Sequence, residues 1–370
     1  MNILYFLIAL LVLALMITIH ELGHYTAGRL LGFKIIDFSV GFGPAILKIK
    51  SKKTDITYAL RAIPLGGACR FYGEEDEADF EGGEKAVPFN AEKPWKRLIV
   101  IFAGPFMNFV LAFVLSFVMM VAFGEQRAVA YPTGDDAVVI QEVVKGSPAE
   151  TSGVKARDII VAVDGTDVSD DPDDFNSKTD LISKMISEAP AEGISLTVLR
   201  DGETVDIEIA DIYNAEKGKN VLGITMGYGI EYVPYGFFRS FKEAGAFLVN
   251  IVKTTFTAIA NGFKTGFKEG DLSGVVGTVA ITMKMASMGV YYVLFIMVLI
   301  SMSLGLMNLL PILPLDGGRL LFDFIELIFK KPVPRKVQNV LSMIGLALLL
   351  MLMVYATIGD IKGIFHGLYS

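Results

Sequence analysis

The sequence predicts a polytopic α-helical membrane protein with about four transmembrane helices, a membrane-associated β-hairpin sheet and an inserted α+β domain. Two observations predict the membrane class. Of the 370 residues 53% are hydrophobic, and the mean hydropathy of +0.53 is too high for an ordinary soluble protein. Four apolar runs also have the length needed to cross a bilayer. The net charge of -7 does not indicate nucleic-acid binding.

The apolar runs cover residues 3–31, 98–123, 290–310 and 340–358. They divide the chain into a first transmembrane helix (1–32), a β-hairpin region with an acidic loop (33–96), a second transmembrane helix (97–124), an inserted domain (131–211), a linker with an amphipathic interfacial helix (212–286), a third transmembrane helix with its following loop (287–337), and a fourth transmembrane helix with the C-terminus (338–370). The first run lacks the basic region and cleavage site of a secretory signal, so we expect a retained helix that Gly32 ends. A signal anchor is the alternative.

A metal-binding pattern lies near the end of the first run. His20 and His24 are four residues apart, so on a helix both imidazoles project from one face and can reach a single metal ion, with Glu21 beside it. This is the zincin arrangement. Its place directly after apolar sequence is unusual, because His and Glu are costly within a membrane and mark functional sites there.

A catalytic zinc site needs a third protein ligand and leaves its fourth position to water. His366 follows the last run and lies on the opposite side by the predicted topology. Asp316 is the better candidate, because it stands among apolar and glycine residues after the third run. An unpaired charge at membrane depth costs about 2.5 to 3.5 kcal/mol, and zinc binding, at about 10 kcal/mol or more, would offset it. The alternative is that Asp316 caps a helix over residues 317–329.

Segments 34–40, 45–50 and 54–63 alternate apolar and polar residues and are separated by glycine and proline, which is typical of β-hairpins. A sheet beside the metal could offer an unpaired edge to an extended peptide; a plain cytoplasmic hairpin is the alternative. Residues 73–83 are acidic and loop-like. Cys69 is the one cysteine, so no disulfide can form within the chain, and its role stays open.

The inserted domain shows short strands with turns between them. Strands are expected at 138–144, 194–200 and 203–210, and residues 158–168 are expected to hold a strand, a turn at Asp164-Gly165 and a second short strand. Helices are expected after Ser147 and over 180–188. The expected fold is a compact, partly open β-barrel with two helices. Residues 236–267 have helical apolar spacing with a polar face, which favours an interfacial helix, and 270–277 are expected to break it.

Lysine and arginine concentrate between the first two runs and between the last two, so the positive-inside rule places both segments in the cytoplasm. The inserted domain and both termini then lie outside, and the metal site lies near the cytoplasmic face. Asn108 falls within the second run. Helix packing or a backbone hydrogen bond is favoured for it over catalysis, and its role stays open.

In combination, several motifs resemble the site-2 protease family of intramembrane metalloproteases. They are His20-Glu21-Leu22-Gly23-His24, Gly66-Gly67, Gly104-Pro105-Phe106-Met107-Asn108, and the run from Asn308 to Arg319. The segments Gly146-Ser147-Pro148-Ala149, Gly153-Val154 and 158–165 resemble the PDZ domains of bacterial proteases, which makes the chain similar to the branch that cleaves anti-sigma factors and remnant signal peptides.

The resemblance implies that Zn²⁺ is held by His20, His24 and Asp316, with Glu21 as the general base. It also implies that Asn308 and the edge strand before Gly66 and Gly67 hold the substrate. The protein would be a multi-pass enzyme of the cell inner or plasma membrane, acting on single-pass transmembrane proteins or signal-peptide remnants after a first cut by another protease. Its PDZ domain would act as a gate outside the membrane.

Two other functions fit parts of the sequence. A non-catalytic membrane scaffold would use the PDZ-like domain and leave the histidines without a role. A metal-ion transporter would use buried His and Asp as an ion pathway. Loss of cleavage in Glu21→Gln, with zinc retained, separates the enzyme from both.

Overall fold

The computed structural model describes residues 3–74, 87–129, 137–169, 175–214, 218–228, 230–266 and 273–365. The chain forms two compact units. The first contains Met1–Ala122 and Gly236–Ser370, and the second contains Phe123–Tyr235. Most of the expected acidic loop (75–86), the start of the inserted domain (130–136) and His366 lie outside the described residues.

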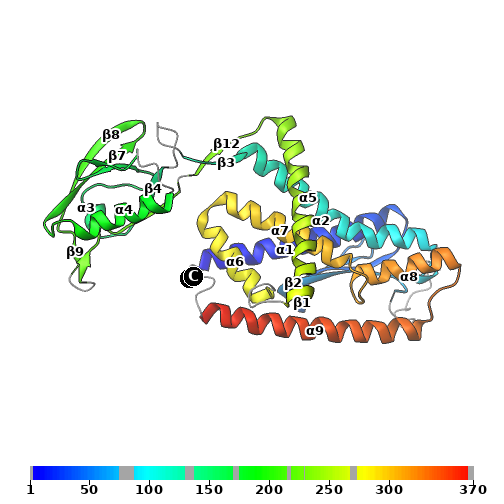
Figure 1. The fold of residues 1–370 in the computed structure, drawn as a ribbon. Coiled ribbons are helices and arrows are strands. Elements are labelled where there is room, and N and C mark those ends of the chain that lie inside the picture. Colours follow the sequence, from blue (N-terminus) through cyan, green and yellow to red (C-terminus); the bar gives the residue numbers. More distant parts are fainter. Residues whose placement is uncertain are drawn as a thin grey trace. The chain divides into compact units, whose positions relative to one another are not determined.

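Four helices in the described part of the chain are long and apolar enough to cross a membrane. They are α1 (Ile3–Leu30), α2 (Pro94–Ala122), α7 (Val290–Asn308) and α9 (Arg335–Phe365). The prediction of a polytopic helical membrane protein is confirmed at this level, although α9 begins at Arg335 rather than Val340. Figure 1 shows α1, α2 and α7 packed in one bundle, in which α2 contacts both of the others.

The helices α1 and α2 approach closely at two glycines. A methyl group on Gly23 would lie 2.2 Å from the carbonyl oxygen of Ala103, and one on Gly104 would lie 2.2 Å from Nε2 of His24. Small residues allow this kind of backbone contact between membrane helices. The metal motif of α1 therefore lies directly against the α2 backbone.

Three further helices complete the first unit: α5 (Phe237–Thr265), α6 (Val275–Met288) and α8 (Asp316–Phe329). The amphipathic helix expected over 236–267 corresponds to α5, which packs against α2 and α7. The expected break over 270–277 is wrong at its end, because α6 begins at Val275. The carboxylate of Asp360 in α9 accepts hydrogen bonds from the amides of Gly274 and Gly277, at 3.1 and 2.7 Å, and so supplies the cap that glycine cannot.

A small sheet packs beside α1. It consists of β1 (Ile35–Lys50) and β2 (Thr57–Phe71), both longer than the segments expected from sequence. Val40 pairs with both Leu60 and Gly67, so the first part of β1 lies between two parts of β2. Residues 67–71 are therefore an outer strand. The edge strand expected before Gly66 and Gly67 is wrong, because residues 57–60 pair with β1 on both sides. The sequence patterns did not predict the outer strand, since it follows Pro64 and Gly66 and begins with Gly67.

Aromatic residues fix this outer strand to the helices. The rings of Phe33, Phe71 and Phe89 lie with centroids 5.0 to 5.8 Å apart, within a buried cluster that includes Val100 of α2. The Phe71 ring fills the notch at Gly28 of α1, where a methyl group would come within 2.4 Å of it. The strand is thus held against α1 just after the metal motif.

The second unit is built on one twisted sheet of order β11-β4-β5-β7-β8, with β6 paired to β5. Its strands are β4 (Val138–Val143), β5 (Ile159–Val163), β6 (Thr166–Asp167), β7 (Gly193–Arg200), β8 (Glu203–Ala210) and β11 (Ile224–Tyr228). The short pairs are β3 (Glu125–Ala128) with β12 (Ile230–Val233), and β9 (Tyr213–Asn214) with β10 (Lys219–Asn220). The sheet thus continues past Asp211, where the expected domain ended.

Two helices, α3 (Pro148–Thr151) and α4 (Phe175–Glu188), belong to this second unit. Ser147 caps α3 as expected, since its hydroxyl accepts a hydrogen bond from the Glu150 amide. Side chains of the sheet and helices share one core, which includes Ile140, Ile160 and Ile182, all fully buried.

Candidate metal centre

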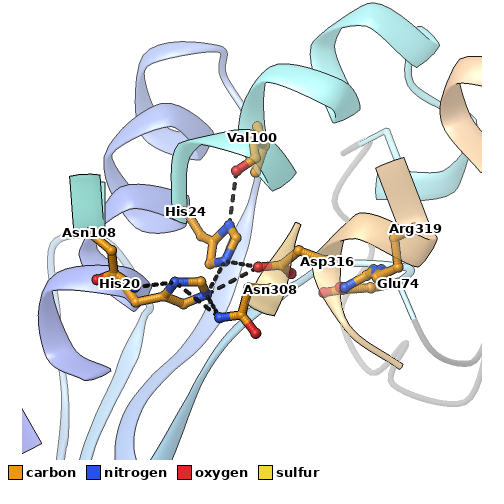
Figure 2. A network of polar contacts seen from close by, with 8 residues as sticks. All are labelled: His20, His24, Glu74, Val100, Asn108, Asn308, Asp316 and Arg319. Carbon is orange, nitrogen blue, oxygen red and sulfur yellow. Dashed lines mark hydrogen bonds and ion pairs between the residues drawn. The ribbon is translucent and has the colours of Figure 1, made fainter. Parts of the chain in front are cut away.

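His20, His24 and Asp316 meet at one point in the first unit (Figure 2). Nε2 of His20 lies 3.2 Å from Nε2 of His24 and 3.1 Å from Oδ2 of Asp316, and the distance from His24 Nε2 to that oxygen is 3.4 Å. Both histidines are buried. Among the described residues this is the one group of three His, Cys, Asp or Glu side chains placed to share a metal ion.

The spacing of these three atoms fits zinc. Tetrahedral ligands about 2.0 to 2.1 Å from a zinc ion lie about 3.3 Å from one another. The three observed distances, 3.1, 3.2 and 3.4 Å, bracket that value. Two imidazoles and one carboxylate are also a common donor set for catalytic zinc. The residues present therefore fit the metal, with the fourth position left for water.

The second ring nitrogen of each histidine has a hydrogen-bond partner that leaves Nε2 available. Nδ1 of His24 lies 2.9 Å from the Val100 carbonyl oxygen, which can only accept, so Nδ1 carries the proton and Nε2 keeps its lone pair. Nδ1 of His20 lies 3.2 Å from the amide of Asn108. Figure 2 shows both partners coming from α2.

Asn108 is fully buried, and its Oδ1 has no hydrogen-bond partner among the described residues, while its Nδ2 faces His20. The two ends of an amide are assigned from their hydrogen bonds. Turning the amide over lets Oδ1 accept the proton of His20 Nδ1, as metal ligation through Nε2 requires. The sequence favoured a packing role for Asn108. The structure shows in addition that its side chain contacts His20 directly.

Glu21, a residue of α1, lies against the outer strand of the sheet. A methyl group on Gly67 would come within 2.7 Å of Cγ of Glu21, and the Glu21 carboxylate interacts with the backbone of Cys69. Gly66 has a positive φ of 89° and would clash with the Phe42 ring if it carried a side chain. The two glycines therefore let the strand come close to Glu21.

Cys69 lies on the same outer strand. Burial, with the nearby carboxylates of Glu21, Glu74 and Asp37, raises the pKa of its thiol well above the ordinary value. A thiol of this kind stays protonated and is a poor metal ligand or nucleophile. These properties favour a packing role for Cys69 beside the site.

Asn308 ends α7 beside the same histidine. Its amide nitrogen lies 3.4 Å from each ring nitrogen of His20, at the long end of hydrogen-bond distances. A short hydrogen bond from Ser301 to the Asn108 carbonyl, 2.8 Å, ties α7 to α2 nearby. Asn308 therefore places a polar amide beside the metal cluster.

Asp316 is the first residue of α8, and its carboxylate faces the histidines. The N-cap of α8 is Leu315, and no side chain caps the helix, so the alternative of Asp316 as the cap is not observed. The loop before it packs tightly: a methyl group on Gly317 would lie 2.3 Å from the carbonyl oxygens of Leu309 and Leu310. Only glycine fits there, and the loop can bring the carboxylate to the metal motif.

An apolar groove of about 630 Å³ adjoins the centre between α2 and α8. Its wall includes Leu98, Phe102, Leu320 and Phe324, and it reaches Gly317 beside the third ligand. The lining of the groove is therefore suited to apolar groups.

Sequence comparison agrees with this geometry. The model of Peptidase family M50 matches residues 8–352. A zinc metalloprotease of Agrobacterium fabrum is 32% identical over 96% of this chain and 95% of its own, and one of Fusobacterium nucleatum is 33% identical over 98% and 99%. The metalloprotease MmpA of Caulobacter vibrioides is 29% identical over 95% and 94%.

Fold and site thus define a multi-pass membrane protein with a zincin-type metal cluster. The chain belongs to Peptidase family M50, the site-2 protease family, and is accordingly a zinc-dependent metalloprotease.

Proposed function

We propose that this protein hydrolyses peptide bonds within transmembrane segments of other membrane proteins, such as anti-sigma factors or remnant signal peptides, after a first cut by another protease. The observation that carries the proposal is the place of the metal cluster. Two of its three residues lie on α1, one of the candidate membrane spans. A protease site at that depth suits substrates that are themselves in the membrane.

The residues have distinct roles. His20, His24 and Asp316 hold the zinc ion, which when bound polarises the scissile carbonyl and lowers the pKa of water at its open position. Glu21 takes a proton from the attacking water and delivers it to the leaving amine. Asn108 and the Val100 carbonyl keep both imidazoles in the required tautomer and orientation.

A helical peptide bond is shielded by its own hydrogen bonds, so the substrate must unwind before it reacts. The outer strand at residues 67–71 is a suitable place for the unwound substrate to bind, because it pairs with β1 on one side and lies against Glu21. An unwound substrate segment adds to that edge, which replaces its lost backbone hydrogen bonds. Asn308, beside His20, would hold the same segment through its side-chain amide.

The second unit is proposed to be a PDZ domain outside the membrane that limits access of substrates with bulky ectodomains. Support comes from the sheet order, in which β11 is an outer strand, and from α4, which packs near β11 and β4. An extended peptide end would add to β11 beside α4. In this proposal both termini also lie outside, and the metal centre lies near the cytoplasmic face of the cell membrane.

The test uses full-length protein with a single-pass model substrate in liposomes. Wild-type protein should release fragments cut within the membrane segment, and Glu21→Gln should release none while it keeps about one zinc ion per chain. Mass spectrometry maps the cut, and metal analysis measures zinc. Equal cleavage by Glu21→Gln, or cuts confined to residues outside the membrane segment, would contradict the proposal. Zinc uptake into protein-containing liposomes that depends on His20 would favour a transporter instead.

A further inference from the structure

A set of buried and half-buried charges lies behind Asp316, away from the histidines. All four charged residues of α8 occupy one face of that helix, at spacings of three, four and three: Asp316, Arg319, Asp323 and Glu326. The other face carries exposed apolar residues, among them Phe324 and Ile328. The third metal ligand therefore shares its helix face with three residues that take no direct part in the cluster.

Arg319 is one turn beyond Asp316 and pairs with Glu74, as Figure 2 shows. Its guanidinium also lies over the Phe89 ring, 5.9 Å from the centroid. The second oxygen of Glu74 accepts a hydrogen bond from the Phe71 amide at 2.9 Å. Phe71 ends the outer strand that passes Glu21, so Glu74 joins that strand to the helix of the third ligand.

Arg97 of α2 makes a second connection on the same face. Its buried guanidinium lies 2.9 Å from Asp323 and 2.5 Å from Glu326, and donates to the Asn90 carbonyl at 2.7 Å. The Asn90 amide in turn donates to the Glu74 carbonyl at 2.9 Å. The two arginines thus belong to one network that links α2, the end of β2 and α8.

The geometry of a helix makes this network relevant to the metal. A side-chain atom about 5 Å from a helix axis moves about 2 Å when the helix turns by 20°. Such a movement would take the Asp316 carboxylate out of the 3.1 to 3.4 Å spacing that it keeps with the histidines. Charges on the same face, fixed to α2 and β2, oppose that rotation.

We propose that Arg319, held by Glu74, is a positioning residue that sets the rotation of α8 and so places Asp316 for zinc. The inference rests on the proposed function, since it gives Asp316 the role of a metal ligand. It adds a link between the outer strand, where substrate is proposed to bind, and the third ligand. Arg97 is a second support for the same helix.

The test measures zinc affinity of full-length protein by competition with a chelator, which needs no substrate. Arg319→Ala and Glu74→Gln should each weaken zinc binding by about tenfold, the lower end of the loss seen for a direct partner of a metal ligand, because they act on Asp316 through α8. Arg319→Lys, which keeps a cation opposite Glu74, should lose less than Arg319→Ala. Glu92→Gln is the matched control, because it removes a comparable ion pair, 3.1 Å to Lys96, that does not involve α8.

Unchanged zinc affinity in Arg319→Ala and Glu74→Gln would overturn the proposal, even if both variants melt at lower temperature, because a merely structural pair would lower stability alone. If Arg319→Ala does not fold, Glu74→Gln and Arg319→Lys give the same comparison. The proposed function fails separately. If His20→Ala binds zinc as tightly as wild type, the cluster is not the metal site, whatever the result at Arg319.

Discussion

The metal ligands are supported in two different ways. On the α2 side, His24 is fixed by backbone contact, because Gly104 leaves no room beside its ring and the Val100 carbonyl holds its Nδ1. His20 contacts the Asn108 side chain of the same helix. On the α8 side, Asp316 depends on side-chain ion pairs made by Arg319 and Arg97. Backbone contacts have one arrangement, whereas ion pairs can lengthen and re-form. His24 is therefore held rigidly, whereas Asp316 is held by contacts that can be adjusted.

The largest effect is expected from the rigid side. Gly104→Ala places a methyl group 2.2 Å from Nε2 of His24, so either the ring or the α1–α2 contact must shift. Zinc affinity should fall by roughly a hundredfold or more, because the displaced nitrogen is itself a ligand. Gly245→Ala in α5 is the matched control, since its methyl group would meet nothing within 4 Å. Equal zinc affinity in both variants would show that the α1–α2 contact is not rigid.

A smaller loss is expected at Asn108. Asn108→Ala removes the partner of His20 Nδ1 and should lower zinc affinity by about tenfold, because the imidazole can then rotate and change tautomer. Ser116→Ala, another buried polar residue of α2, should leave the affinity unchanged. Chelator competition measures both variants. A loss at Ser116 as large as that at Asn108 would indicate a general packing defect instead.

The smallest expected effect is a change in the stability of the folded protein with pH, caused by Asp323 of α8. Burial, opposed by Arg97 and Arg319, raises the pKa of Asp323 to about 6. Since this pKa is above the unfolded value, the folded protein binds the extra proton, and stability falls as pH rises through 6. Thermal unfolding of wild type should therefore lose about 1 kcal/mol relative to Asp323→Asn between pH 5 and pH 7.5. If wild type instead becomes more stable relative to Asp323→Asn as pH rises, the ion pair with Arg97 outweighs the cost of burial.

Much of the site follows from residue types and spacing. The pair His20 and His24 is readable because helical geometry alone puts both on one face, and Asp316 because a carboxylate in apolar sequence needs a partner. The four spans follow from hydropathy. The start of α9 does not follow from hydropathy, because polar residues such as Arg335 extend the helix beyond its apolar part.

Other parts could not be predicted from local pattern. The outer strand at 67–71 contains Gly67, and glycine lowers strand propensity. Glycine is needed there because the strand approaches Glu21 closely, a contact between residues far apart in the sequence. The pairing of Arg97 with Asp323 joins residues far apart in the sequence, so no spacing rule reveals it. Similarly, β11 pairs with β4, which lies far from it in the sequence, so local patterns could not predict where the inserted domain ends.

The central claim is that one zinc ion is bound by His20, His24 and Asp316, and X-ray absorption at the zinc edge tests it most directly. The wild-type protein should show a four-coordinate ion with two imidazole ligands and oxygen at the remaining positions. Asp316→Ala should lose the ion or show one oxygen ligand replaced by solvent with weaker binding. An unchanged spectrum and unchanged affinity in Asp316→Ala, or a site without imidazole in wild type, would contradict it.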